Sequence, residues 1–228
     1  ALAARLDKLD YRTYVLLGDG EIAEGAVWEA ASLAGVNKLN NLVAIVDVNR
    51  LGQSQETAFG HHLDVYAKRF VGFGWRVEVI DGHDLDEILE VLAAAGLGEQ
   101  PLVILARTLK GAGISFIQDK EGWHGKPLNK EEAAKAIAEL QPKAQSGVGV
   151  SIQAPSQLST PNNAVPTSYP PVNYKVGDSV ATREAFGAAL LRIGEVDPRV
   201  VAMDGDTKNS TFSDKFYKKY PDRFTECF

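Results

Sequence analysis

The chain has 228 residues, or one to one and a half domains at roughly 150 residues each, and its 45% hydrophobic and 24% charged residues exclude a disordered or fibrous protein. The net charge of −6 argues against broad nonspecific binding to nucleic acid or to an anionic membrane. No stretch approaches the roughly 20 apolar residues that span a bilayer, and residues 1–10 lack the apolar run of a secretory signal. The single cysteine, Cys227, excludes an intrachain disulfide. We therefore expect a cytoplasmic protein.

Short apolar runs alternate with helical spacings along the first 140 residues. The run Tyr14–Leu17 predicts a buried strand that enters the tight turn Gly18-Asp19-Gly20. Strands are predicted at 14–17, 42–48, 76–80 and 102–106, and helices at 23–34, 63–70, 85–95 and 131–140. Gly35 and Asn37 supply stop signals for the first of these helices. Strands alternating with helices predict the α/β class, with a mostly parallel sheet and helices on both faces.

The composition changes between Gln141 and Val172, where Ser, Pro, Gln and Asn dominate. This change predicts an extended linker over 141–173. Beyond it a helix is predicted at 181–193, a strand at 200–203 and a helix at 212–220. We therefore expect one partial domain over 1–140 and the opening of another over 174–228. The first ten residues have helical spacing and the last ones end in an aromatic run, so we expect an internal fragment cut at the edge of a strand.

The residues most suggestive of chemistry follow the first two predicted strands. Asp19 follows one, and Asn49 follows the next, so the two side chains should meet at the edge where open α/β sheets bind ligands. An Asp carboxylate, an Asn amide oxygen and a main-chain carbonyl such as that of Leu51 are hard ligands that suit Mg²⁺ when phosphates complete its shell. Gly18 and Gly20 would let a diphosphate approach the backbone. The structural alternative is a simple turn with a capping Asn, which the paired spacing and strand context disfavour.

Several motifs in collinear order resemble the transketolase family, in its animal-type form. They cover nearly the whole chain except the linker and some helices. The motifs are Gly18-Asp-Gly-Glu-Ile-Ala-Glu-Gly25, Asn49-Arg-Leu-Gly-Gln-Ser54, Thr108-Leu-Lys-Gly-Ala-Gly113, Trp123-His-Gly-Lys-Pro127, Ala181-Thr-Arg183 and Asp204-Gly-Asp-Thr-Lys-Asn-Ser-Thr-Phe-Ser213. The resemblance implies a thiamine diphosphate-binding fold, with the second half of the diphosphate-binding domain in 1–140 and the start of the pyrimidine-binding domain in 174–228.

The resemblance also implies a cofactor site. Asp19, Asn49 and the main-chain oxygen of Leu51 would bind Mg²⁺, or Ca²⁺ or Mn²⁺ in its place, in agreement with the ligand argument above. Gly18, Gly20 and Asn49 would lie at the diphosphate of thiamine diphosphate.

Other residues acquire roles only through the resemblance. Lys110 and His124 would line the active site near the cofactor, and His124 would hydrogen-bond the oxygens of the sugar. Arg183 and Ser210 would grip the phosphate of the sugar, which suits a guanidinium fork and a hydroxyl donor. Glu24 would lie at a homodimer interface, in a hydrogen-bonded link between two active sites.

Four polar residues have weaker or structural interpretations. Gln53 lies just past the metal loop and would approach the cofactor. His61, His62 and His83 have no partner at a useful metal spacing, and we interpret them as surface or structural residues.

The implied activity is the reversible transfer of a two-carbon ketol unit from a ketose phosphate to an aldose phosphate through a thiamine diphosphate adduct, in the pentose phosphate pathway. The family's glutamate that assists deprotonation of the cofactor would lie a few residues beyond Phe228, and its substrate-channel histidines would lie upstream. The piece alone is therefore expected to be inactive. Two alternatives stay open: another thiamine diphosphate enzyme, such as deoxyxylulose phosphate synthase or dihydroxyacetone synthase, and a noncatalytic paralogue that keeps the cofactor contacts.

Overall fold

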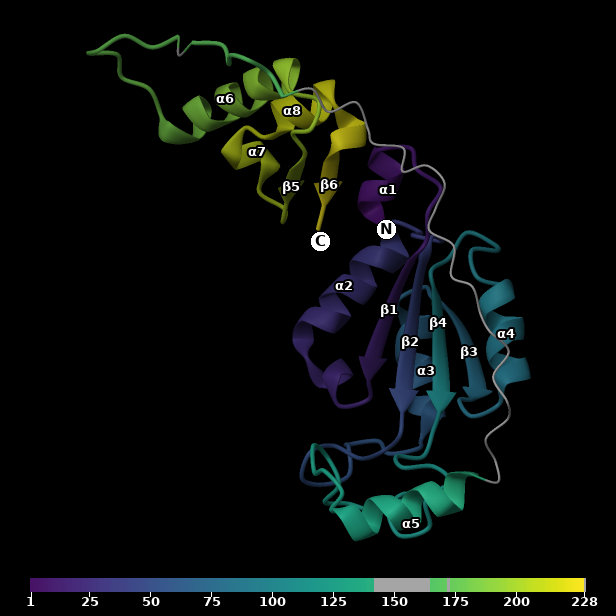
Figure 1. The fold of residues 1–228 in the computed structure, drawn as a ribbon. Helices are drawn as coiled ribbons and strands as arrows, with labels where there is room; N and C mark the ends of the chain where they lie inside the picture. The colour runs from purple at the N-terminus through teal and green to yellow at the C-terminus, as the bar shows by residue number, and fades with distance from the viewer. Residues whose placement is uncertain (142–164, 172, 228) are drawn as a thin grey trace. The chain divides into compact units, whose positions relative to one another are not determined.

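The computed structural model describes residues 1–141, 165–171 and 173–227. Most of the predicted linker, over residues 142–164 and 172, lies outside the described residues. The chain divides into two units, one made of residue 1 with 10–153 and the other of 2–9 with 154–228 (Figure 1).

The first unit is built on a four-stranded sheet that confirms the predicted parallel architecture. Its strands are β1 (Thr13–Gly18), β2 (Leu42–Val48), β3 (Arg76–Asp81) and β4 (Leu102–Arg107). The strand order is β1-β2-β4-β3, and every neighbouring pair is parallel. The four strands begin and end within one residue of the predicted limits on either side, because each is a short apolar run bounded by polar or turn residues.

Helices cover both faces of this sheet, as predicted. The helical segments are η1 (Glu21–Ala23), α2 (Gly25–Val36), α3 (Leu63–Gly72), α4 (Leu85–Ala93) and α5 (Lys130–Leu140). Side chains of α4, such as Ile88 and Leu92, pack on Val43 and Ile104 at one face of the sheet. Helices α2 and α3 lie on the opposite face, which is the one that carries Ala44. Figure 1 shows α5 beyond the carboxyl ends of the strands.

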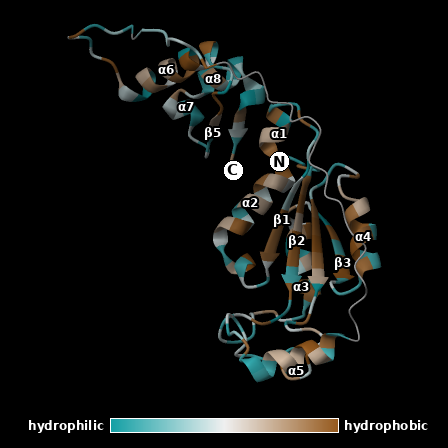
Figure 2. Cartoon of the chain, viewed as in Figure 1, coloured by the Kyte–Doolittle hydropathy of each residue, from teal (hydrophilic) through white to brown (hydrophobic). Residues whose placement is uncertain are grey.

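The residues of β2 are buried on both faces of the sheet. The strand's odd-numbered and even-numbered residues face opposite helices, and Val43, Val46 and Val48 are fully buried. Hydrophobic residues accordingly predominate along the strands in the hydropathy view (Figure 2). Within the described residues, none of the helices combines the length and the apolar character that crossing a membrane requires.

The structure corrects the prediction that Gly35 stops the first long helix. Gly35 lies inside α2, which continues to Val36 and ends at Asn37. A Cβ atom at Gly35 would lie 1.7 Å from the main-chain oxygen of Phe73. This glycine is therefore required because two backbone segments approach closely, and the helix ends one residue later.

The second unit holds shorter elements. They are α1 (Leu2–Leu6), α6 (Thr182–Val196), β5 (Ala202–Asp204), α7 (Lys208–Thr211), α8 (Asp214–Lys219), η3 (Pro221–Arg223) and β6 (Phe224–Glu226). Strands β5 and β6 pair in parallel. The helix predicted at 181–193 is confirmed as α6, and the predicted strand at 200–203 is found two residues later as β5.

The helix predicted over 212–220 is wrong at its start. Phe212 has φ of 60°, in the left-handed region, so it separates α7 from α8. A Cβ atom at Gly187 of α6 would lie 2.5 Å from the Cβ atom of Phe212, so α6 packs tightly on this turn. Helix α7 was not predicted, because a polar four-residue helix leaves no apolar periodicity in the sequence.

Candidate functional site

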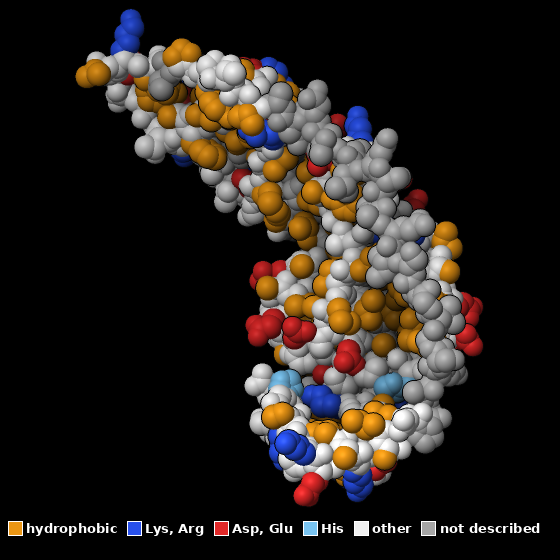
Figure 3. Space-filling view, in the orientation of Figure 1, with side chains coloured by type: hydrophobic (Ala, Val, Ile, Leu, Met, Phe, Trp, Pro, Cys, Tyr) orange, Lys and Arg blue, Asp and Glu red, His pale blue; other side chains and the backbone are white. Residues whose placement is uncertain are grey.

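The register of β1 and β2 brings the predicted ligands together. Gly18 lies opposite Asp47 in the sheet, and the main-chain nitrogen of Asp19 donates to the Asp47 carbonyl at 3.1 Å. Asp19 and Asn49 therefore leave neighbouring strand ends at the same edge, as the sequence predicts. Acidic, basic and histidine side chains gather around this edge and α5 in the space-filling view (Figure 3).

Asp19 is almost completely buried, with 5% of its surface exposed, and its carboxylate is hydrogen-bonded. Its Oδ2 atom accepts hydrogen bonds from the main-chain nitrogen of Arg50 at 2.7 Å and from Oγ1 of Thr57 at 3.1 Å. Burial raises the pKa of the Asp19 carboxyl, these hydrogen bonds oppose the rise, and the nearby charge of Asp47 adds to it.

The other two predicted ligands also present oxygen atoms here. Oδ1 of Asn49 accepts from the main-chain nitrogen of Leu51 at 3.1 Å, and the Leu51 carbonyl accepts from Nζ of Lys110 at 2.9 Å. The Lys110 ammonium group thus already donates a hydrogen bond to one of the predicted ligands, the Leu51 carbonyl. Because a carbonyl oxygen has two lone pairs, Leu51 can keep this contact and still bind a cation.

The donor set therefore fits a hard divalent ion. Among the described residues, no group of three or more His, Cys, Asp or Glu side chains could hold a metal ion. The set described above is of a different kind, since only one of its three oxygens comes from such a side chain.

A cavity of about 750 Å³ gathers the predicted residues of this unit, within the size range of small-molecule sites. Its lining consists of Leu17, Gly18, Asp19, Gly20, Glu21, Glu24, Val27, Asn49, Leu51, Gly52, Gln53, Lys110 and His124. All the cofactor and metal residues predicted from the sequence are among them, together with Glu24 and Gln53. The residues come from separate segments of the chain, so the fold has brought together what the sequence keeps apart.

The glycine turn differs from the prediction in one respect. The main-chain nitrogen of Gly18 donates to Oε2 of Glu21 at 2.6 Å, so an anion would have to displace Glu21 to reach it. At Gly20 a Cβ atom would have its nearest neighbour 3.9 Å away, which leaves this backbone open. The segment after Gly20 is the short helix η1, and the longer helix α2 begins only at Gly25, with Glu24 at its N-cap position.

Lys110 and His124 are brought into contact by the loop that follows β4. Nζ of Lys110 lies 3.2 Å from Nδ1 of His124. Because an ammonium can only donate, Nδ1 accepts, and the neutral ring then carries its proton on Nε2. The two residues can thus offer one proton at a defined atom beside the cavity.

The histidines interpreted as structural do bind the backbone. Nε2 of His61 lies 2.9 Å from the carbonyl of Thr108, and Nε2 of His83 accepts from the main-chain nitrogen of Leu109 at 2.9 Å. Both contacts fix the segment that immediately precedes Lys110. No hydrogen bond is described for the imidazole of His62, which is consistent with a surface position within the described part of the chain.

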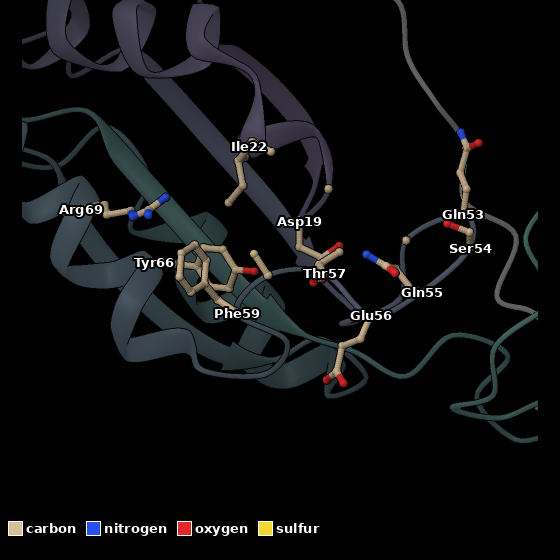
Figure 4. Close-up of a pocket in the computed structure, with 14 residues that line it drawn as sticks. Asp19, Ile22, Gln53, Ser54, Gln55, Glu56, Thr57, Phe59, Tyr66 and Arg69 are labelled. Atoms are coloured by element: carbon tan, nitrogen blue, oxygen red, sulfur yellow. Dashed lines mark hydrogen bonds between the residues drawn. The ribbon is translucent and has the colours of Figure 1, made fainter.

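A second cavity of about 300 Å³ adjoins the first and shares Asp19 with it (Figure 4). The hydroxyl of Tyr66, Thr57 and the carboxylate of Asp19 lie side by side there. Burial raises the pKa of Tyr66, the Thr57 contact opposes the rise, and the Asp19 charge adds to it. Sequence reasoning missed Thr57 and Tyr66, since a lone hydroxyl in a loop and an aromatic residue at core spacing give no signal.

The two predicted residues of the second unit lie on the helices α6 and α7. The guanidinium carbon of Arg183, on α6, lies 5.8 Å from the ring centroid of Phe212. Oγ of Ser210, on α7, donates to the carbonyl of Thr207 at 3.0 Å. Both side chains are exposed, and in the described structure no hydrogen bond joins them.

Comparisons with known proteins point to one family. The family described as "Transketolase, thiamine diphosphate binding domain" matches residues 3–154, and "Transketolase, pyrimidine binding domain" matches residues 178–228. Rat transketolase is 49% identical over 227 residues, which are 97% of this chain and 36% of the rat protein. Mouse transketolase-like protein 2 is 45% identical over 226 residues, again 97% and 36%.

Solved structures agree on the fold. The crystal structure of Pichia stipitis transketolase in complex with sedoheptulose 7-phosphate has a TM-score of 0.74 and 21% identity, and the match covers 99% of this chain and 42% of that one. The chain thus spans little more than a third of the length of the curated relatives that it matches.

Proposed function

We infer the function of this chain from its family, because the chain belongs to the transketolases. We propose that it forms part of an enzyme that reversibly transfers a two-carbon ketol unit from a ketose phosphate to an aldose phosphate with the help of thiamine diphosphate. The single observation that carries this proposal is the cavity that Asp19, Asn49, Lys110 and His124 line together.

The oxygens at the sheet edge would hold the cofactor through a metal ion. We assign Oδ1 of Asp19, Oδ1 of Asn49 and the carbonyl of Leu51 to Mg²⁺, which Ca²⁺ or Mn²⁺ could replace. Gly20 and Asn49 would face the diphosphate, and Gly18 would contribute once Glu21 has moved away. When bound, thiamine diphosphate supplies the carbon nucleophile that protein side chains lack.

His124 and Lys110 would handle protons at the sugar. The contact between Nζ of Lys110 and Nδ1 of His124 leaves the Nε2 proton available to hydrogen-bond an oxygen of the substrate. Lys110 also donates to the Leu51 carbonyl, so the same side chain contacts both His124 and a proposed metal ligand.

Arg183 and Ser210 would bind the phosphate of the sugar. A guanidinium fork and a hydroxyl donor suit that group. The sugar phosphate in the Pichia structure supports this class of substrate.

The assembly and setting of the enzyme complete the proposal. We assign residues 1–140 to the diphosphate-binding domain, 141–173 to a linker and 174–228 to the pyrimidine-binding domain. The working form would be a cytoplasmic homodimer of the pentose phosphate pathway, with active sites between subunits and Glu24 in the link between them. Neither nucleic acid nor a membrane would be a partner.

A coupled ketol-transfer assay tests this function. The full-length protein in which this sequence occurs should turn over a ketose phosphate and an aldose phosphate only when thiamine diphosphate and Mg²⁺ are present, whereas the 228-residue chain alone should be inactive. Cofactor binding without turnover by the full-length protein would instead identify a noncatalytic relative.

A further inference from the structure

Asp47 is a charged residue near the end of an otherwise apolar strand. Its side chain is half-buried and lines a cavity of about 230 Å³ whose other walls, apart from Thr108, are apolar side chains and Gly82. A carboxylate in such surroundings is costly unless hydrogen-bond donors reach it. No motif in the sequence singles it out, so its partners must explain it.

Two donors reach the Asp47 carboxylate from neighbouring strand ends. Oδ2 accepts from Nδ2 of Asn49 at 3.2 Å, and Oδ1 accepts a short hydrogen bond from Oγ1 of Thr108, which directly follows β4. One carboxylate thus joins the ends of β2 and β4.

The first contact fixes the orientation of the Asn49 amide. The nitrogen of the amide faces Asp47, and its oxygen faces the other way. That oxygen accepts from Leu51, at the side of the proposed metal site. A reversed amide would present its NH₂ group to the metal and could not act as a ligand.

The second contact fixes the start of the loop that carries Lys110. The main-chain nitrogen of Thr108 donates to the carbonyl of Val48 at 3.1 Å, and its own carbonyl lies 2.9 Å from Nε2 of His61. Lys110 follows two residues later and binds Leu51. The Asp47 carboxylate therefore fixes the position of Asn49, a proposed metal ligand after β2, relative to the Lys110 loop after β4.

We propose that Asp47 is a positioning residue of the cofactor site, which orients Asn49 for the metal ion and anchors the Lys110 loop through Thr108. Among the described residues, the lining of the 750 Å³ cavity includes Asn49 but not Asp47, so Asp47 acts through its partners. This inference rests on the proposed cofactor site and adds to it a residue that the motif comparison does not assign.

The test measures Mg²⁺ affinity in the presence of thiamine diphosphate, by isothermal calorimetry on the full-length protein. D47N keeps the size of the side chain but replaces one acceptor oxygen with a donor, and it should weaken Mg²⁺ binding about 10- to 100-fold, the usual effect of losing an outer-shell partner. T108V should weaken binding several-fold, because it removes the hydroxyl, whereas T108S should restore it. Excess Mg²⁺ should recover most of the turnover of D47N.

The outcomes separate the inference from the function on which it rests. If D19N abolishes Mg²⁺ binding while D47N and T108V bind like the wild type, the positioning role is wrong and the cofactor site stands. If D19N binds Mg²⁺ normally, the cofactor site itself is wrong. If D47N does not fold, the comparison of T108V with T108S decides, and equal Mg²⁺ affinities of those two variants would overturn the role of Asp47.

Discussion

The proposed cofactor site in the first unit and the proposed phosphate-binding residues in the second unit differ in the hydrogen bonds that fix their side chains. At the sheet edge of the first unit, Asp19, Leu51 and Lys110 are fixed by hydrogen bonds that connect different strand ends. In the second unit, the contacts described for Arg183 and Ser210 are with the ring of Phe212 and the carbonyl of Thr207.

This difference shows what a parallel sheet contributes to a binding site. Strand register sets the positions of several oxygen atoms at once, at the edge of the sheet where we propose the cofactor site. Arg183 and Ser210, which we propose to bind the phosphate, lie instead on the helices α6 and α7. We therefore expect substitutions at the sheet edge to affect binding of the cofactor as a whole, and substitutions in the second unit to affect one substrate contact.

The largest effect is expected for D19N. It removes the charge of the central metal ligand, so Mg²⁺-dependent binding of thiamine diphosphate should weaken by about 100-fold or more, beyond the usual effect of an outer-shell change. Fluorescence titration of the full-length protein measures it. D86N, at an exposed position of α4, is the matched control and should bind normally. Equal affinities of D19N and D86N would contradict the metal assignment.

The next largest effect is expected for R183Q, which should raise the KM for a phosphorylated ketose about 10- to 100-fold. A hydrogen bond to a charged group contributes about 1.5–3 kcal/mol, which sets this range. Steady-state kinetics with phosphorylated and unphosphorylated donors measure it, and only the phosphorylated donor should respond. S210A should show a smaller change in the same direction. R192Q, nine residues along the same helix, serves as the control, and an equal rise in KM for both donors would contradict the phosphate assignment.

A smaller effect is expected for K110M, which should lower kcat by about tenfold. The substitution removes the donor to His124 and the bridge to Leu51, each a charged hydrogen bond. Stopped assays at saturating cofactor measure the loss. K126M removes a lysine that lies 4.4 Å from the ring of Trp123, and it should leave kcat nearly unchanged. Equal losses in the two variants would show that general loop packing matters and the Lys110 contacts do not.

The smallest effect concerns stability and its pH dependence. Hydrogen bonds from Arg199 hold the pKa of Asp197 well below its ordinary value of 3.8, although burial opposes them. A carboxyl with a lowered pKa in the folded state stabilises the protein above its unfolded pKa, and this contribution disappears as the pH falls further. D197N should therefore lower Tm at pH 7, and the difference from the wild type should shrink steadily below about pH 4.

Thermal unfolding of the full-length protein between pH 7 and pH 3 measures this difference. D206N is the control, because Asp206 is exposed and has φ of 79°, a conformation that Asn tolerates. A Tm difference for D197N that stays constant with pH would show that the ion pair is not its cause.

The sequence was sufficient to place the candidate residues that directly follow the predicted strands. Apolar runs located the four strands, and parallel pairing then placed Asp19 beside Asn49 without any structure. The family motifs added Lys110 and His124, which share the cavity with them.

The remaining residues could not be predicted, because their roles depend on the path of loops. Thr57 reaches Asp19 across 38 positions of sequence, and Glu21 turns back to bind Gly18. Phe212, with its left-handed backbone, packs closely against Gly187 of α6, and no local pattern encodes this contact. Periodicity reports which face of an element is buried, but it says nothing about such contacts.

The decisive experiment on the proposed cofactor site is to locate Mn²⁺ by anomalous scattering in crystals of the full-length protein grown with thiamine diphosphate. We expect Mn²⁺ within bonding distance of a carboxylate oxygen of Asp19, Oδ1 of Asn49 and the carbonyl of Leu51, with cofactor oxygens completing the shell. A Mn²⁺ ion bound elsewhere, or thiamine diphosphate bound without contact to these three oxygens, would contradict the assignment.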